Sequence, residues 1–591
     1  MNRIRAGKSA IAALVLLPAC VFAIGLCVER WGVFSALKEE VQTRDVPGWA
    51  FRSGKRARIL VQLGLIGAFA FDPSEVDPAL NWRGVPRLRQ PPNPLARRPP
   101  RPLFFSLDHV RPEDLPSTTL VDRREIEKGV PLLSIAVRKA DLYDPSTGLL
   151  AKSNLLKRGQ AWERPAFASY MNGGKTVFGS GVGLRLHGGI TRLYSPNKSF
   201  RMYLRPQYGL HDVARDIFFQ EGGRPLRTVV LGNDVRLDRS DRRYQFVGSI
   251  AFEIADRIGC LVPRTKPVRF FLNGEFQGVY VLSEHLDKHL LTDRYGHDRF
   301  VFARCKPAQG KDLVKYGDPR EYQQFATWAR SDRARTMEEV SRRVDIENLT
   351  LWFLSILFCG TTDADQGAAL LDQSRADSRW FWINWDMDLS FLSHLLKRVR
   401  YPWEFDAFAH VTSSRSGSVR GSILRGLLRT SEPYRAYFRD RFVEVMNHKF
   451  TPDFLRDLLD RYRALGATFG VEQPDVFDDI QQFLERRPAV LRQQMKAYAG
   501  AGDAFQIAIS GPSGVRFEVD GFPVGASYSG WYFEGMDVRV RPVFLDGGAF
   551  SHWRVNGVDQ SAGVGGTLIR RVTSDATLEA VFVQPPAAST R

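Results

Sequence analysis

Residues 130–284 carry the clearest period-2 pattern of apolar and polar positions in the chain. The runs "VPLLSIAV" (130–137), "GVGLRLHGGITRL" (181–193) and "KSFRMYLR" (198–205) alternate, or are rich in β-branched and aromatic residues, with glycines between them. This pattern is typical of strands that bury one face. Asn273-Gly274-Glu275, between two apolar runs, is a hairpin turn signal. The pattern therefore predicts a strand-rich first lobe.

From residue 345 the apolar positions change to a helical period. The run "IENLTLWFLSILFCG" (346–360) is apolar on nearly every side, so we expect a central buried helix that Asp345 caps and Gly360 ends. Thr451 opens another helix with apolar residues at i, i+4 spacing, and one earlier helix is expected at 247–259. The order predicts an α+β protein, with a strand-rich lobe, a helical lobe and a ligand cleft between them.

After about residue 503 the alternation returns. Apolar and polar residues alternate in "FQIAIS" (505–510), "VRFEVD" (515–520) and "DVRVRPVF" (537–544), with glycine turns between the runs. This predicts an all-β, sandwich-like module of roughly 80 residues, a size that can fold alone. The module contains no catalytic constellation.

The N-terminal segment "SAIAALVLLPACVFAIGLCV" (9–28) is twenty residues without a charge, which is long enough to cross a bilayer. Arg3, Arg5 and Lys8 precede it, and the positive-inside rule keeps such cations in the cytoplasm. We therefore expect a single-pass anchor in a bacterial cell membrane, with the bulk of the chain outside the cytoplasm. The alternative is a cleaved signal peptide and a secreted protein.

These signals divide the chain into four parts. They are the anchor or signal segment (1–30), a juxtamembrane region and linker (31–125), the main globular domain (126–502) and the β module (503–585). The linker contains "RLRQPPNPLARRPPRPLF" (87–104), whose proline and arginine content is typical of a semi-rigid tether.

Charge and cysteine content add limited information. The 591-residue chain has a net charge of +18, which favours anionic partners such as phosphates, anionic lipids or acidic glycans without choosing among them. Beyond the N-terminal segment, Cys260, Cys305 and Cys359 are widely spaced, which indicates neither a disulfide framework nor a zinc site. We expect buried thiols.

The first group with candidate chemistry lies in "LRLHGGITRLYSPNKSFRMYLRPQYG" (184–209). The backbone amides of Gly188 and Gly189 are free to approach an anion, because no side chain obstructs them. Lys198 shares the parity of the apolar residues of the following strand, and a buried lysine requires a partner such as phosphate or a carboxylate. The alternative is a lysine at the strand start that extends into solvent.

The second group is acidic. Asp363 follows the end of the buried helix, and Asp386 and Asp388 follow the aromatic run "RWFWIN" (379–384). Phosphoryl transfer needs such an arrangement, in which one carboxylate orients or deprotonates a hydroxyl and another holds Mg²⁺. Taken alone, the pair also suits a helix or turn cap, or a metal-dependent glycosyltransferase.

Together these motifs resemble those of the CotH kinase family, the spore-coat protein H-like group of atypical protein kinases. The resemblance rests on "GVGLRLHGGITRLYSPNKSFRMYLRPQYG", "LNGEFQGVYVLSEHLDK" and "WINWDMDLSF", and it covers about residues 130–500 in the same order. It implies a divergent, two-lobed kinase-like fold that binds ATP and Mg²⁺ (or Mn²⁺). It also implies transfer of phosphate to Ser or Thr of secreted or cell-envelope proteins.

The resemblance carries over to individual residues. Lys198 matches a lysine expected near the nucleotide phosphates, and Glu284 matches the glutamate that closes the "GVY-L-E" motif, which implies a place in the nucleotide site. Asp363 is similar to the catalytic-loop aspartate, Asp386 to the metal-binding aspartate, and Asp388 to the second acid of that pattern. Arg185, Arg192 and Arg201 are further candidates for phosphate contacts.

One position departs from the kinase pattern. Where kinases have an asparagine about five residues after the catalytic aspartate to hold a second metal, this chain has Ala368. Gln366 is a possible but poorer substitute as a metal ligand. This departure leaves open a pseudokinase that serves as an envelope scaffold.

The C-terminal module resembles internalin-type B-repeat modules of bacterial surface proteins, through "FEGMDVRVRP" (533–542) and "FSHWRVNG" (550–557). That resemblance implies an adhesive or spacer role. We expect two partners: a protein substrate of the cell envelope, and the membrane, which the N-terminal helix would bind. We expect no nucleic acid partner. A glycosyltransferase with a sugar-nucleotide donor is the third hypothesis, although it leaves the motifs around Lys198 and Glu284 unexplained.

Overall fold

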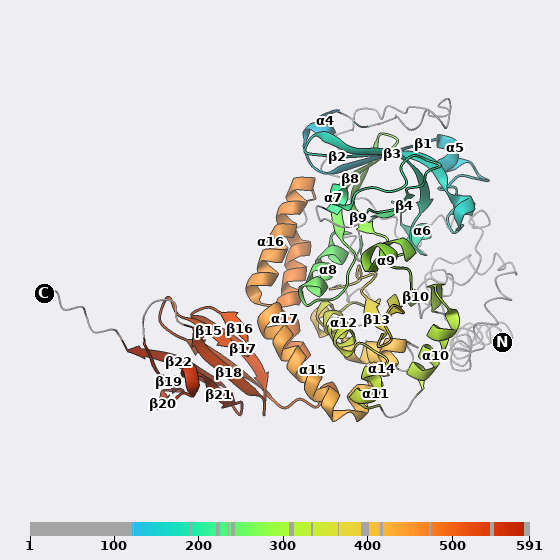
Figure 1. Cartoon of the computed structure of the whole chain (residues 1–591). Helices are drawn as coiled ribbons and strands as arrows, with labels where there is room; N and C mark the ends of the chain where they lie inside the picture. The colour runs from blue at the N-terminus through green and yellow to red at the C-terminus, as the bar shows by residue number, and fades with distance from the viewer. Residues whose placement is uncertain are drawn as a thin grey trace, which may run out of the picture.

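The computed structural model describes residues 121, 123–189, 191–195, 197–219, 225–233, 236–237, 243–305, 312–331, 335–364, 366–391, 401–413, 418–471, 474–543 and 549–583 (Figure 1). The predicted N-terminal anchor lies outside these residues, and so does the linker that follows it, except for residues 121 and 123–125. Among the described residues, no helix combines the length and the apolar character needed to cross a membrane.

A closed barrel of seven strands forms the first part of the described chain, at the top of Figure 1. The strands follow the order β1-β2-β3-β4-β5-β9-β8, and β1 closes the barrel by pairing in parallel with β8. Their bounds are β1 (Leu132–Val137), β2 (Arg164–Asn172), β3 (Lys175–Leu186), β4 (Phe200–Tyr203), β5 (Thr228–Gly232), β8 (Thr265–Leu272) and β9 (Glu275–Glu284). Closure leaves no unpaired sheet edge. The sequence pattern predicted the strands but not the barrel.

The hairpin between β8 and β9 forms where the turn signal predicted it. Asn273 and Gly274 have φ values of 50° and 83°, as a tight turn between twisted strands requires. The Asn273 side chain also pairs with the backbone of Val137, donating to its carbonyl and accepting from its amide at 2.8 Å each. These two bonds fix the tip of the hairpin to the end of β1.

A second sheet of four antiparallel strands follows the barrel, in the order β11-β10-β12-β13. It consists of β10 (Phe300–Cys305), β11 (Leu313–Tyr316), β12 (Gly367–Asp372) and β13 (Phe381–Ile383). β12 and β13 lie beyond residue 345, where the sequence pattern turned helical, so the helical part contains half of this sheet. β13 lies within the aromatic run at 379–384.

Helices pack around this sheet. The longer ones are α8 (Val247–Arg257), α10 (Pro319–Arg330), α12 (Ile346–Cys359), α14 (Val419–Thr430), α15 (Glu432–Glu444), α16 (Pro452–Phe469) and α17 (Pro474–Ala499). Shorter elements are α4 (Arg123–Glu127), α5 (Lys139–Tyr143), α6 (Thr191–Tyr194), α7 (Arg215–Phe219), α9 (Lys288–Tyr295), α11 (Met337–Ser341), α13 (Ala407–Thr412) and a β6–β7 pair (Arg236–Leu237 and Arg243–Tyr244). α16 and α17 run side by side in Figure 1, and the Arg269 guanidinium of β8 donates to the Phe469 carbonyl at the end of α16.

The predicted central helix is α12. The Asp345 side chain caps it by accepting a hydrogen bond from the Asn348 amide at 2.9 Å. All but two of its residues are buried, and it ends at Gly360, whose φ is +59°. A Cβ at Gly360 would lie 2.8 Å from the Phe483 ring, so both the conformation and the close packing favour glycine. The predicted cap and stop are confirmed.

The C-terminal module is a pair of β-sheets, with strand orders β17-β14-β22-β19-β20 and β16-β15-β18-β21. The strands are β14 (Ala504–Ser510), β15 (Arg516–Val519), β16 (Phe522–Val524), β17 (Ser527–Phe533), β18 (Asp537–Val543), β19 (Ala549–Val555), β20 (Val558–Gln560), β21 (Leu568–Arg571) and β22 (Ala576–Val583). The module contacts the main domain at the π-helix Val445–Lys449. There the Asn447 side chain makes two 3.0 Å hydrogen bonds with the Trp531 backbone, and the His448 ring stacks on Phe522.

The mixed α+β class is confirmed by these elements, whereas the two-lobed kinase-like arrangement stays a prediction. Cys260, Cys305 and Cys359 are free and buried, as the sequence predicted. Burial raises the pKa of the Cys260 and Cys305 thiols to about 12 and about 11, so both remain protonated at neutral pH.

Candidate metal centre and adjoining cations

Asp363 lies in the turn that connects α12 to β12. The chain leaves the helix at Gly360, and Asp363 follows within three residues. Gln366 closes the turn, because its amide donates to the Asp363 carbonyl at 2.9 Å and its Nε2 donates to Asp363 Oδ2 at 3.0 Å. Gln366 therefore supports the Asp363 carboxylate directly, and its role as a metal ligand stays a prediction.

Asp386 and Asp388 lie just past β13. Asn384 is buried and fixes the chain there, donating from Nδ2 to Ser355 Oγ on α12 at 2.9 Å and from its backbone amide to the Leu261 carbonyl. Asp386 has a φ of +59°, a left-handed conformation that few residues other than glycine, asparagine and aspartate adopt. Met387, between the two acids, is buried. The chain thus directs both carboxylates to the same side.

Backbone hydrogen bonds join the two acidic segments. The Thr362 amide donates to the Leu389 carbonyl at 3.4 Å, and the Phe391 amide donates to the Cys359 carbonyl at 2.9 Å. The turn after α12 and the segment after β13 are therefore held next to each other, although Asp363 and Asp386 are 23 residues apart in the sequence.

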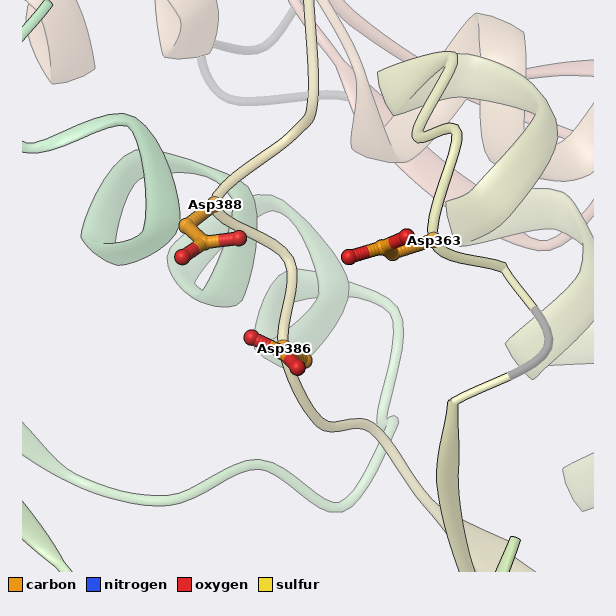
Figure 2. A group of neighbouring side chains, drawn as sticks. All are labelled: Asp363, Asp386 and Asp388. Carbon is orange, nitrogen blue, oxygen red and sulfur yellow. The ribbon is translucent and has the colours of Figure 1, made fainter. Parts of the chain in front are cut away.

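The three carboxylates form one cluster. Each of Asp363, Asp386 and Asp388 offers an oxygen within 4.8 Å of the others, and all three side chains are half-buried. Figure 2 shows Asp363 pointing toward Asp388 and Asp386 from the opposite side. Three like charges at this separation repel one another unless a cation lies between them. Carboxylate oxygens are the ligands that Mg²⁺ and Mn²⁺ prefer, so the cluster fits such an ion. No other group of this kind occurs among the described residues.

Cations gather beside the cluster. Burial and the positive charge of Arg201 lower the pKa of the Arg304 guanidinium, while the Asp386 carboxylate raises it. Burial and then Arg304, Arg158 and Arg201 lower the pKa of Lys315. The pKa of Arg158 is lowered by burial and by Arg201. Arg304 thus interacts electrostatically with Asp386 and with Arg158, Arg201 and Lys315, and four neighbouring cations favour a ligand with several negative charges.

Aromatic and imidazole rings lie among these cations. The Arg304 guanidinium lies 5.1 Å from the centre of the Trp385 ring, and the His285 ring contacts the rings of Trp385 and His187. Burial, Arg201, His187 and Arg304 hold the pKa of His285 well below its ordinary value, so this imidazole is neutral. Its Nδ1 is buried and has no hydrogen-bond partner among the described residues.

The sequence patterns missed Arg158, Arg304 and Lys315. Arg304 carried a usable signal, because it is the charged residue in the otherwise apolar strand "FVFARC" (300–305). In the β10–β12 pairing it lies directly opposite Ala368. Opposed residues of an antiparallel pair project to the same face. Ala368 and Arg304 are therefore neighbours on one face of this sheet.

Of the other predicted residues, Arg201 joins the cation group, with Nη2 2.8 Å from His187 Nδ1. Lys198 lies before β4, and its ammonium donates to the carbonyls of Arg192 and Ser195 at 2.6 and 2.5 Å. Glu284 is fully buried, where it pairs with Arg215 at 2.7 Å and accepts from the Arg264 amide. Lys198 and Glu284 thus both have partners other than the acidic cluster.

The remaining predicted residues, Arg185, Arg192, Gly188 and Gly189, lie in or near the loop between β3 and β4. Arg185 forms an ion pair with Glu163, and Arg192 donates to the carbonyls of Leu186 and Lys157. The Gly188 carbonyl accepts from Arg158 at 3.3 Å, and a Cβ at Gly188 would lie 2.9 Å from Thr191 Oγ1. At Gly189 a Cβ would meet open space.

A family model described as CotH kinase protein matches residues 184–499, which is more than half of the chain. The protein therefore belongs to the CotH kinase family. The match contains Asp363, Asp386 and Asp388 and ends at Ala499, the last residue of α17. No curated protein matches the chain.

Proposed function

We propose that this protein is a metal-dependent kinase that transfers phosphate from ATP to Ser or Thr of secreted or cell-envelope proteins, with a divergent two-lobed kinase-like fold. Membership of the CotH kinase family supports a kinase in general terms. The observation that carries the proposal is the cluster of Asp363, Asp386 and Asp388, whose carboxylate oxygens lie within 4.8 Å of one another.

In this proposal the three acids have different roles. Asp386 and Asp388 hold Mg²⁺ or Mn²⁺, which when bound neutralises charge on the transferring phosphoryl group. Asp363 orients the acceptor hydroxyl and takes its proton. The hydroxyl oxygen forms a bond to the γ-phosphorus while the bond between that phosphorus and the β–γ bridging oxygen breaks, and ADP leaves with the bond's electron pair. The hydrogen bond from Gln366 keeps Asp363 in place.

Arg158, Arg201, Arg304 and Lys315 bind the phosphates of ATP. Burial and neighbouring cations lower the pKa of Arg158, Arg304 and Lys315, which indicates charges that a polyanion would stabilise. Ala368 does not count against activity, because position 368 is a buried strand position opposite Arg304. A single cation held by the acids is compatible with that arrangement.

The test is phosphate transfer by the full chain. We expect label from γ-labelled ATP to appear on the protein itself or on envelope proteins when Mg²⁺ or Mn²⁺ is present, and none in the presence of a chelator. Stabilisation and transfer with a nucleotide sugar in place of ATP would point instead to the glycosyltransferase hypothesis.

Arg304 provides a more specific prediction. Replacing Arg304 by glutamine is expected to raise the KM for ATP about tenfold to a hundredfold, because a hydrogen bond to a charged group contributes about 1.5–3 kcal/mol. Thermal stability should change little, since its positive neighbours and burial disfavour the charge in the absence of ligand. Arg375→Gln, at an exposed arginine in the β12–β13 turn, is the control. An unchanged KM in Arg304→Gln would contradict the proposed phosphate contact.

A scaffold that binds nucleotide without transferring phosphate is the second candidate. The contacts of Lys198 and Glu284 favour it, because both residues that the motifs associate with the nucleotide have structural partners. Stabilisation by ATP and Mn²⁺ without transfer to any envelope protein would support the scaffold over the kinase.

We also propose a single-pass location in a bacterial membrane, with the described domains outside the cytoplasm. The uncharged run at 9–28 and the cations before it support this topology. An alkaline phosphatase fusion after residue 35 should be active only if that point is exported. Activity of a cytoplasmic reporter at the same point would overturn the topology.

A further inference from the structure

Arg420 is a buried arginine next to the acidic cluster. It lies in the first turn of α14 with 1% of its surface exposed, and its guanidinium lies 4.1 Å from the centre of the Trp352 ring on α12. Its Nη2 donates to the carbonyls of Ala364 and Gln366 at 3.2 and 3.0 Å. Those carbonyls belong to the turn that carries Asp363.

Gly367 makes this approach possible. A Cβ at Gly367 would lie 2.7 Å from Arg420 Nη1 and 3.2 Å from its Cζ. Real Cβ atoms essentially never show a contact of 2.7 Å, so any larger residue would displace the guanidinium or the start of β12. The glycine at the first position of β12 and the arginine on α14 therefore form a matched pair.

The other side of the turn is also fixed. His410 Nε2, on α13, lies 3.0 Å from the Thr362 carbonyl. Arg420 thus bonds to the carbonyls of Ala364 and Gln366, and His410 contacts the carbonyl of Thr362. Asp363 lies between these anchored positions. Gln366 connects the Arg420 contact to the Asp363 carboxylate, because its carbonyl accepts from Arg420 and its side chain donates to Asp363 Oδ2.

We propose that Arg420 is a positioning residue for the acidic cluster: it holds the Asp363 carboxylate beside Asp386 and Asp388, where its negative charge strengthens binding of the divalent cation that those two acids hold. This inference rests on the proposed function of the cluster as a metal site. A planar guanidinium can donate to two carbonyls from one nitrogen while its face packs on Trp352, whereas a lysine ammonium offers no such flat surface.

The test measures Mn²⁺ binding by titration calorimetry on the full chain, first without nucleotide. We expect Arg420→Lys to raise the Kd for Mn²⁺ about tenfold or more, since displacement of a site group by about 1 Å has effects up to a hundredfold. We expect Gly367→Ala to raise it in the same direction. In the transfer assay, the Mg²⁺ concentration for half-maximal rate should rise more than the KM for ATP.

Arg487→Lys is the matched control. Arg487 is equally buried, and it too donates to carbonyls, those of Leu357, Trp403 and Phe405, but none of these belongs to the turn at 362–366. We expect a lower melting temperature and an unchanged Mn²⁺ Kd in this variant. An equal rise in Kd in both arginine variants would identify a general structural effect and overturn the proposal.

The outcomes separate this inference from the proposed function. Absence of Mn²⁺ binding by the unmodified protein would refute the metal site itself, and with it the role of Arg420. Normal binding by the unmodified protein and by Arg420→Lys would refute only the positioning role. If Arg420→Lys does not fold, Gly367→Ala decides, because it displaces the same contact and retains the arginine.

Discussion

Replacement of Asp386 by asparagine is expected to lower the rate of phosphate transfer by about a thousandfold or more. Removal of one negative charge from the cluster weakens the hold on the cation, whose charge stabilisation contributes several kcal/mol, and each 1.36 kcal/mol is a factor of ten. Asparagine has the same shape and tolerates the left-handed φ of +59° at this position. The fold should therefore be retained, and kcat/KM and Mn²⁺-induced thermal stabilisation are the measurements.

Asp377→Asn is the control for this prediction. Asp377 is an exposed acid in the turn between β12 and β13, where it pairs with Arg375. Its loss should leave both transfer and metal stabilisation unchanged. Comparable activity in Asp386→Asn and the unmodified protein would mean that the cluster does not serve phosphate transfer, whatever the family membership implies.

Replacement of Glu284 by alanine is expected to lower the free energy of unfolding by about 3–5 kcal/mol, the usual effect of removing one partner of a buried ion pair. Glu284 is 0% exposed, its Oε1 lies 2.7 Å from Arg215, and its Oε2 accepts from the Arg264 amide. Truncation leaves the largely buried Arg215 guanidinium and that amide without their acceptor. Urea unfolding followed by tryptophan fluorescence measures the loss.

The double variant Glu284→Met with Arg215→Met provides the control. It removes both charges together, so it should be more stable than Glu284→Ala. A Glu284→Ala protein with unchanged stability and lost ATP binding would instead favour the role in the nucleotide site that the family motif implied.

The acidic cluster was predictable because each acid follows a recognisable element end. Gly360 marks the end of α12, and the aromatic run that ends at Asn384 is typical of a strand, so Asp363 and Asp386 could each be placed in a loop from local patterns alone. The distance between them could not be predicted, because it depends on backbone bonds such as that from Thr362 to Leu389.

Local sequence patterns could not predict which cations lie together beside the acidic cluster. Arg158 lies before the barrel strand β2, Arg201 in β4, Arg304 in β10 and Lys315 in β11, and only the tertiary fold brings them together. The family motif drew attention to Arg201 and the apolar strand could have marked Arg304, but on a chain with 83 lysines and arginines nothing marks Arg158 or Lys315. The motif lysine Lys198 drew attention instead, and its ammonium is occupied by two backbone carbonyls.

The fold was predicted to a similar extent. Strand and helix types follow from the period of apolar positions, so the class and α12 were correct. Closure of the barrel depends on the parallel pairing of β1 with β8, and the second sheet joins β10 to β12, which lie on either side of α10, α11 and α12. Such long-range pairings leave no trace in the spacing of apolar residues.

The contact between Asn447 and Trp531 has a consequence for how the molecule tumbles. The asparagine side chain makes the pair of hydrogen bonds that a neighbouring strand would make with β17, and only residues 500–503 separate α17 from β14. Because the connection is short and these two hydrogen bonds cross the contact, the module has little freedom to rotate relative to the main domain. In solution the main domain and the C-terminal module should therefore rotate as one rigid body, with a single rotational correlation time.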